Sequence, residues 1–206
     1  MPAAKPARAL LLLAVASIAV GCSNSRFRSE QQVDSPGNVA IGTTLVRDPD
    51  ARASARLNPV GTGGVEGSIR FLQFGNDLVI RVEARDLPAN GSFGVHVHEG
   101  HDCSTAEPGI GGHFNPTNAP HGRPGSGAHH AGDLPNLRAD AYGMAGYATT
   151  SAVLTVNAGP NSVIGRVVVI SSRADDFRTQ PDGNSGPPLA CGFVRLDGRA
   201  FGAPSR

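Results

Sequence analysis

The sequence predicts an all-β protein, an antiparallel sandwich or barrel. Several short segments are rich in β-branched residues and alternate in polarity, as half-buried strands do. No stretch of ten or more residues combines a helical period with helix caps. The 206 residues include 27 glycines and 16 prolines but no tryptophan, a composition that suits a protein with many turns better than a helical bundle.

The first two predicted strands, Val65–Phe71 and Leu78–Ala84, flank Gly75-Asn76-Asp77, which is typical of a hairpin turn. The further predicted strands are Ser92–His98, Gly143–Thr150, Ala152–Val156, Val163–Ile170 and Cys191–Asp197. Two long segments break the strand pattern, from Gly100 to about Tyr142 and from Ser171 to Ala190. Loops of this length are uncommon in compact domains unless something organises them.

The first 22 residues are typical of a targeting segment. Lys5 and Arg8 precede Ala9–Val20, an uncharged run that is too short to span a bilayer but suits a signal peptide. The segment ends in Ala19-Val20-Gly21-Cys22, which resembles a bacterial lipobox, so we expect a lipid on Cys22 that anchors the protein to a membrane. The alternative is an ordinary secretory signal that is cleaved near the same place. Both alternatives export the protein to the bacterial cell envelope or periplasm.

Residues 23–50 are polar and show no sustained periodicity, which predicts a flexible tether before a domain over residues 51–206. The formal net charge is +1, and it stays close to neutral when Lys5 and Arg8 leave with the signal peptide. Without a basic excess, nucleic acid is not an expected partner. No interface pattern in the sequence sets the oligomeric state.

The three cysteines fit an exported protein. If Cys22 carries a lipid, then Cys103 and Cys191 remain as a pair that is free to form a disulfide in an oxidising compartment. A disulfide that closes a loop of this length stabilises the fold by roughly 4–5 kcal/mol in the loop-entropy account. The alternative is two separate buried thiols.

All seven histidines lie between His96 and His130, a density that neither strand nor loop propensity explains. His96-Val97-His98 belongs to a predicted strand, in which alternate side chains project to one face. We therefore expect both imidazoles to point the same way and Val97 to enter the core.

A second set of metal-binding residue types follows on the glycine- and proline-rich loop. His113, His121, His130 and Asp133 are spaced 8, 9 and 3 residues apart. Three imidazoles and one carboxylate can close tetrahedrally around zinc, and binding would order the loop. The alternative is a set of solvated surface histidines, which is the interpretation that we give to His101 and His129.

These motifs resemble the Cu/Zn superoxide dismutases over about Ala53 to Asp197. The matching segments are Gly94–Glu99, Gly112–Pro116, His121-Gly122, His130–Asn136, Gly165-Arg166, Ala174–Asp176 and Leu189–Gly192. The resemblance implies a Greek-key β-sandwich or flattened barrel of about eight antiparallel strands with two long loops.

The resemblance also implies roles for individual residues. The copper ligands would be His96, His98 and His113, and the zinc ligands would be His113, His121, His130 and Asp133, with His113 bridging the two metals. Cys103 and Cys191 match the intrasubunit disulfide of the family. Asp175 matches a carboxylate that bonds one imidazole at each metal site and fixes its orientation.

Two positions depart from the family pattern. Ser171 occupies the place of the fourth copper histidine, and no histidine follows His130. Pro188 occupies the place of the active-site arginine, and proline offers neither charge nor donor to a substrate anion. A serine hydroxyl is a poor replacement for imidazole at Cu(II), so we expect weak or absent copper binding.

The leading hypothesis is a zinc-binding envelope protein of this family in which superoxide dismutation is weak or lost. The alternative is a functional periplasmic dismutase, converting superoxide to oxygen and hydrogen peroxide, in which His101, His129, water or a partner subunit completes the copper site. Metal ions, the membrane through Cys22, and superoxide if the protein is active are the expected partners. Protein recognition through the sandwich faces has no specific supporting feature.

Overall fold

The computed structural model describes residues 38–41, 44–105 and 109–198. The chain divides into two compact units, Met1–Val46 and Arg47–Arg206. In the predicted tether, β1 (Asn38–Ile41) and β2 (Thr44–Arg47) form a two-stranded sheet of their own. The predicted signal peptide and Cys22 lie outside the described residues, so they stay predictions, as does the tether. Among the described residues, no helix has the length and apolar character needed to cross a membrane.

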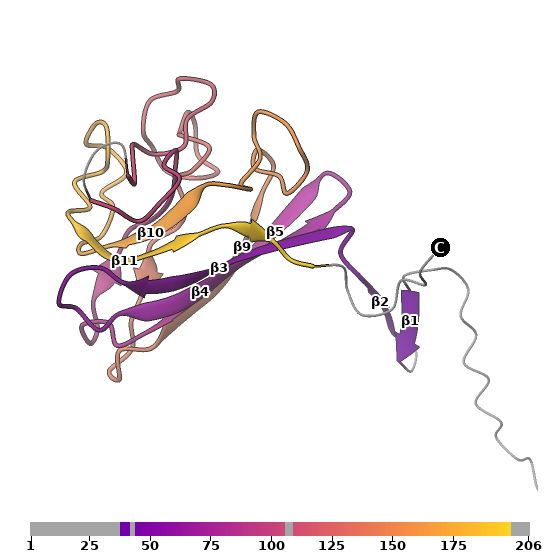
Figure 1. Ribbon diagram of the computed structural model, residues 1–206, viewed down its shortest axis with the longest axis horizontal. Helices are drawn as coiled ribbons and strands as arrows, with labels where there is room; N and C mark the ends of the chain where they lie inside the picture. The colour runs from indigo at the N-terminus through magenta and orange to yellow at the C-terminus, as the bar shows by residue number, and fades with distance from the viewer. Residues whose placement is uncertain (1–37, 42–43, 106–108, 199–206) are drawn as a thin grey trace, which may run out of the picture. The chain divides into compact units, whose positions relative to one another are not determined.

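The second unit is built on one antiparallel sheet with strand order β7-β10-β11-β3-β4-β5-β9, and β12 also pairs with β3 (Figure 1). Its strands are β3 (Ala51–Pro59), β4 (Glu66–Phe74), β5 (Asp77–Arg85), β7 (Val95–His98), β9 (Ala145–Ser151), β10 (Val167–Ser171), β11 (Pro188–Phe193) and β12 (Arg195–Leu196). A separate pair consists of β6 (Ser92–Phe93) and β8 (Leu137–Arg138). The described residues contain no α-helix, which confirms the all-β prediction.

The sheet curls so that its two parts enclose one core. Ile69 of β4 faces Val82 of β5 in the ladder, and neither side chain is exposed to solvent. These residues share a single apolar cluster with Val97 of β7 and with Val168 and Ile170 of β10. Burial of this continuous apolar face gives the main stabilisation, as in other sandwich and barrel proteins.

The outer face of β10 is also buried. Val167 and Val169 point away from the main core and pack with Cys191 in a second, smaller cluster. Cys103 and Ile110, from the long loop after β7, cover this cluster. Both long loops gather on this side of the sheet, which shields the outer faces of β7 and β10 from solvent (Figure 1).

Several sequence expectations differ from the structure. The predicted strand Val163–Ile170 begins only at Val167, and predicted Cys191–Asp197 is divided between β11 and β12 at Val194. Ala152–Val156 is not a strand, because the Val156 amide donates to the Gln73 side chain at 3.0 Å and not to a strand ladder. Ser92–His98 divides at Gly94, whose amide donates to the Arg173 carbonyl at 2.8 Å. The long strand β3 was not predicted, because its buried positions are mostly alanines that give a weak hydrophobic alternation.

Candidate metal centre

β7 presents two histidines on its outer face. It pairs with β10 in a register that places His96 opposite Val169 and His98 opposite Val167. Val97 lies in the main core and is fully buried, while the two imidazoles point to the opposite face, beneath the loops. The prediction that both imidazoles share one face and that Val97 enters the core is confirmed.

The loop between β7 and β9 returns over these histidines and is held there by main-chain hydrogen bonds. The Phe114 amide donates to the Val97 carbonyl at 2.8 Å, and the Val97 amide donates to the Gly132 carbonyl at 2.9 Å. A Cβ atom at Gly132 would lie 2.1 Å from the Val97 oxygen, so only glycine allows this approach. Two isolated bridges, His98 with His113 and His96 with Asp133, fix the loop in register with β7.

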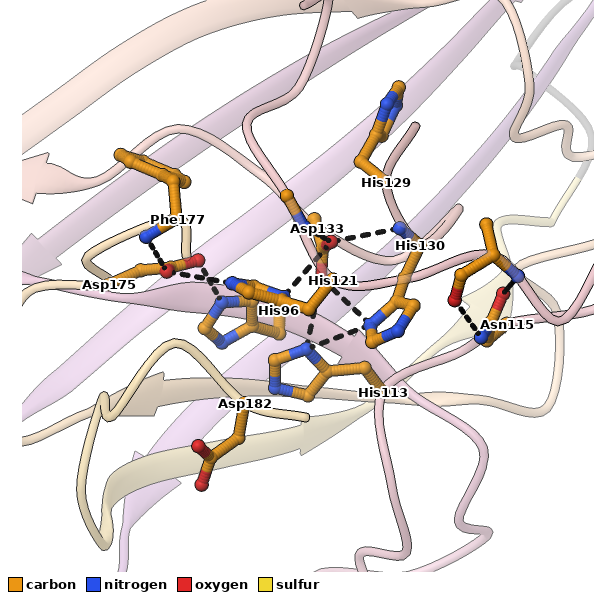
Figure 2. A network of polar contacts seen from close by, with 12 residues as sticks. His96, His113, Asn115, His121, His129, His130, Asp133, Asp175, Phe177 and Asp182 are labelled. Atoms are coloured by element: carbon orange, nitrogen blue, oxygen red, sulfur yellow. Dashed lines mark hydrogen bonds and ion pairs between the residues drawn. The ribbon is translucent and has the colours of Figure 1, made fainter. Parts of the chain in front are cut away.

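The first group of potential ligands consists of His113, His121, His130 and Asp133, all buried (Figure 2). The Nδ1 atoms of the three histidines lie 2.9, 3.1 and 3.3 Å from Asp133 oxygens, and His113 Nδ1 lies 3.4 Å from His130 Nδ1. Zn–N bonds of about 2.0–2.1 Å place tetrahedral ligand atoms about 3.3 Å apart. These four side chains therefore fit a tetrahedral zinc site.

The second group consists of His96, His98 and His113, whose ligand atoms also lie within 4.8 Å of one another. The His96 and His113 rings stack with centroids 3.9 Å apart, and the His98 ring meets the His113 ring edge-on at 4.9 Å. His113 belongs to both groups, so one imidazole lies between the two sites.

Hydrogen bonds fix which nitrogen carries the proton in three of the buried histidines. Asp175 lies 2.9 Å from His96 Nε2 and 2.9 Å from His121 Nε2, and because an ionised carboxylate only accepts, both nitrogens donate to it. His98 Nδ1 donates to the Gly111 carbonyl at 3.0 Å. The opposite nitrogens, His96 Nδ1, His98 Nε2 and His121 Nδ1, are buried and accept no hydrogen bond. Three buried lone pairs without a partner are what a metal centre requires.

The pKa values favour the forms that bind metal. Burial, opposed only in part by the hydrogen bond to Asp175, lowers the pKa of His96 to about 4, and burial lowers that of His98 to about 3. Burial alone would raise the pKa of Asp133, but the hydrogen bond from His113 and the neighbouring groups lower it to about 2. At neutral pH these are neutral imidazoles and an ionised carboxylate, so metal does not have to displace protons from them.

Three residues that support the site were not assigned roles from the sequence. The Gln180 side chain accepts from the His121 amide at 2.8 Å and donates to the His121 carbonyl at 2.9 Å. Asn136 clamps the main chain of Asp175 in the same way, at 2.9 and 2.8 Å. A Cβ atom at Gly183 would lie 1.9 Å from the Asp175 carboxylate, so this glycine leaves room for it. Nothing in the sequence around Gln180 or Asn136 indicates that these side chains hold the main chain of a metal-site residue.

The two positions that depart from the family pattern face each other. Ser171 ends β10, and its Cα partner across the ladder to β11 is Pro188. Both residues line a pocket of about 600 Å³ that also contains His98 and His113. His101 and His129 do not line this pocket. His101 Nδ1 donates to the Gly165 carbonyl at 3.1 Å, and His129 Nδ1 donates to the Gly127 carbonyl at 3.0 Å.

The remaining predicted pair is joined: Cys103 and Cys191 form a disulfide. It ties the loop after β7 to β11, beside the small cluster on the outer face of β10. An antiparallel all-β fold that holds two groups of buried ligands sharing one histidine defines a class of protein with a two-site metal centre.

The comparisons with known proteins identify the family within that class. The family model described as copper/zinc superoxide dismutase (SODC) matches residues 65–194. The chain therefore belongs to the Cu/Zn superoxide dismutase family. A Cu-Zn superoxide dismutase of Aquifex aeolicus is 32% identical over 71% of this chain and 88% of its own length, and one of Candida glabrata is 36% identical over 66% and 93%.

A second kind of relative matches as well. The mouse copper chaperone for superoxide dismutase is 36% identical over 71% of this chain, and the human one is also 36% identical over 71%. The match spans only 54% of each chaperone. Membership of the family therefore does not by itself set the activity of this chain.

Proposed function

We propose that this protein is a zinc-binding member of the superoxide dismutase family in the bacterial envelope, with a reduced copper site and weak or lost dismutation. The observation that carries the proposal is the pairing of Ser171 with Pro188 in the pocket beside His98 and His113. Where the family pattern has an imidazole and a guanidinium, this pocket has a hydroxyl and an apolar ring.

Zinc would be held by His113, His121, His130 and Asp133. The spacing of their ligand atoms, between 2.9 and 3.4 Å, supports this assignment. No open coordination position remains beside four protein ligands, which is typical of a structural zinc site. Its role would be to hold the long loop against β7.

Copper, when bound, supplies one-electron redox chemistry to members of this family. The residual site of His96, His98 and His113 offers three nitrogens, which suits Cu(I) better than the tetragonal preference of Cu(II). Ser171 offers only a neutral oxygen. A site that favours one oxidation state is poorly suited to a reaction that alternates between two.

Nearby arginines do not replace the missing cation in the pocket. Arg173 donates through Nε to the Asn184 carbonyl at 3.1 Å and through Nη2 to the Asn184 side chain at 2.8 Å. Neither Arg173 nor Arg178 belongs to the pocket lining. Among the described residues, the pocket lining therefore offers no guanidinium that could hold superoxide next to the three histidines.

Two other functions have specific support. The Aquifex and Candida relatives are named superoxide dismutases, which favours residual activity. The chaperone relatives favour copper handling without turnover, for which a three-nitrogen site that binds Cu(I) would suffice.

We also propose export and lipid anchoring through Cys22, supported by the charged start, apolar run and lipobox of residues 1–22.

The test is metal analysis of the purified protein together with a dismutase assay after copper loading. We expect one equivalent of zinc, little copper and background activity. The double variant Ser171→His, Pro188→Arg should retain more copper and show more activity than the wild type or either single variant.

The matched control is Ser172→His, Pro187→Arg, which introduces the same side chains one position away, outside the pocket lining. It should leave copper retention and activity unchanged. Stoichiometric copper and rapid turnover in the wild type would overturn the proposed function. An inert double variant would show that the cause lies at other residues.

A further inference from the structure

The charged residues that line the pocket over the three-histidine group are acidic. Glu99 and Asp182 contribute carboxylates, and the described lining residues include no arginine or lysine. Within the described part of the chain, the pocket is therefore negative.

No ion pair among the described residues neutralises these two carboxylates. Glu99 accepts from the Asn115 amide at 3.3 Å, and Asp182 accepts from the Asn184 amide at 3.1 Å. Arg166 lies close to Glu99, but its guanidinium stacks on the Phe114 ring at 4.2 Å and donates to the Glu99 carbonyl, not to its carboxylate. The two carboxylates can therefore attract a dissolved cation electrostatically.

The inner end of the pocket points to a ligand of the opposite sign. His98 lines it, and its Nε2 atom is a buried acceptor without a donor. The buried Nδ1 of His96 likewise has no hydrogen-bond partner. Such lone pairs attract cations and repel anions. The neutral donors in the lining, such as Ser171 and Asn115, offer an anion only uncharged contacts.

From these observations we propose that the pocket is an entry path for metal cations, guided by Glu99 and Asp182, and that it disfavours small anions such as superoxide. The inference rests on the proposed function and deepens it: the species that this site takes from solution is the metal ion. Charged walls of a cleft can raise the association rate of an oppositely charged solute by 10-fold or more, and salt suppresses the effect.

The test follows Cu(II) uptake by the zinc-loaded, full-length protein in a stopped-flow instrument, using visible absorption at low and high ionic strength. We expect the association rate constant to fall as salt rises. Asp182→Asn and Glu99→Gln should each lower it roughly 3- to 10-fold at low salt and little at high salt. Asp77→Asn removes an exposed charge at the first residue of β5, outside the pocket lining, and is the matched control.

A second measurement separates electrostatics from loosening of the loop. Asp182→Lys should slow Cu(II) uptake and at the same time strengthen binding of azide to the copper-loaded protein, measured by its charge-transfer absorption. A loosened loop would change both in the same direction, and that result would overturn the proposal. Uptake that ignores salt, or no uptake by the three-histidine group, would overturn it as well.

The two proposals fail in different ways. Rapid dismutation together with salt-dependent Cu(II) uptake would remove the proposed function and leave the cation path. Zinc binding without turnover, together with salt-independent uptake, would remove the cation path alone.

Discussion

At the scale of single residues, one carboxylate sets the proton positions of two histidines that belong to different ligand groups. Asp175 accepts from His96 and from His121, and the Phe177 amide also donates to it at 2.6 Å. Burial by itself would raise the pKa of Asp175, but the hydrogen bond from His96 and the other donors lower it. The ionised form therefore persists, and both imidazoles keep their free Nδ1 atoms directed to the metal positions.

Asp175→Asn should weaken zinc binding by about 10- to 100-fold, the usual effect of removing a group that orients a metal ligand. An asparagine oxygen can accept from one imidazole, but its amide group cannot accept from the other. Competition with a chelator measures the zinc affinity. The neighbouring variant Asp176→Asn, whose exposed side chain accepts hydrogen bonds from Arg178 and Thr179, should bind zinc like the wild type. Equal affinities in both variants would contradict this role for Asp175.

At this scale the sequence predicts much of the site. The alternation His96-Val97-His98 places both imidazoles on one face, and the structure brings the loop histidines and Asp133 together. The supporting contacts of Gln180 and Asn136 were beyond prediction, because they depend on how two distant loops meet. Ser171 lies opposite Pro188 because the strand register shifts at the end of β10. No local sequence pattern predicts this shift.

At the scale of elements, the disulfide and the site are connected through one loop segment. Cys103 is bonded to Cys191 of β11, and the same loop continues through Ile110 to Gly111, whose carbonyl orients His98. Removing the disulfide would therefore free the loop segment around Gly111, whose carbonyl fixes the His98 ring.

The variant Cys103→Ser, Cys191→Ser should lose about 2–4 kcal/mol of unfolding free energy, measured by urea denaturation. Its copper affinity should fall more than its zinc affinity, because Gly111 orients His98, which belongs only to the group that would hold copper. An equal loss at both sites would indicate general loosening of the loop. Unchanged copper affinity would contradict the connection through Gly111.

Element boundaries were predicted best where burial alternates with large side chains, as in β4 and β5. β3 was missed because Ala53 and Ala55 bury little surface, and so the alternation is weak in sequence. The prediction of a strand over Ala152–Val156 was wrong for the opposite reason. Large apolar side chains alternate there, but Leu154 and Val156 are buried in the core without belonging to a strand.

At the scale of the whole molecule, the buried imidazoles couple global stability to pH. The ordinary pKa of 6.5 applies to His96 and His98 in the unfolded chain, whereas burial lowers the folded values to about 4 and about 3. At pH values between the folded and the unfolded pKa, the unfolded chain binds more protons than the folded one. The free energy of unfolding must therefore rise with pH and fall as the solution is acidified.

For the chelator-treated protein we expect unfolding free energy to fall as pH is lowered from about 6.5 towards 4, with each group contributing up to about 1.4 kcal/mol per pH unit. Urea denaturation at several pH values measures the slope. His98→Gln should flatten it, whereas His101→Gln, at an exposed position, should not. A slope that is the same in His98→Gln as in the wild type would contradict the assignment.

The position of β3 has a consequence for when this fold can be completed. β3 is the first strand of the main sheet along the chain, yet it pairs with β11 through Asn58 and with β12 through Ser54. Strands from opposite ends of the described domain therefore close the sheet together. Folds dominated by such distant pairings form slowly, because a long segment must be ordered before its contacts are gained. During synthesis the sheet therefore remains incomplete until β11 and β12 have been made. For a protein that crosses a membrane as an extended thread, as we propose here, delayed closure keeps it competent for transport.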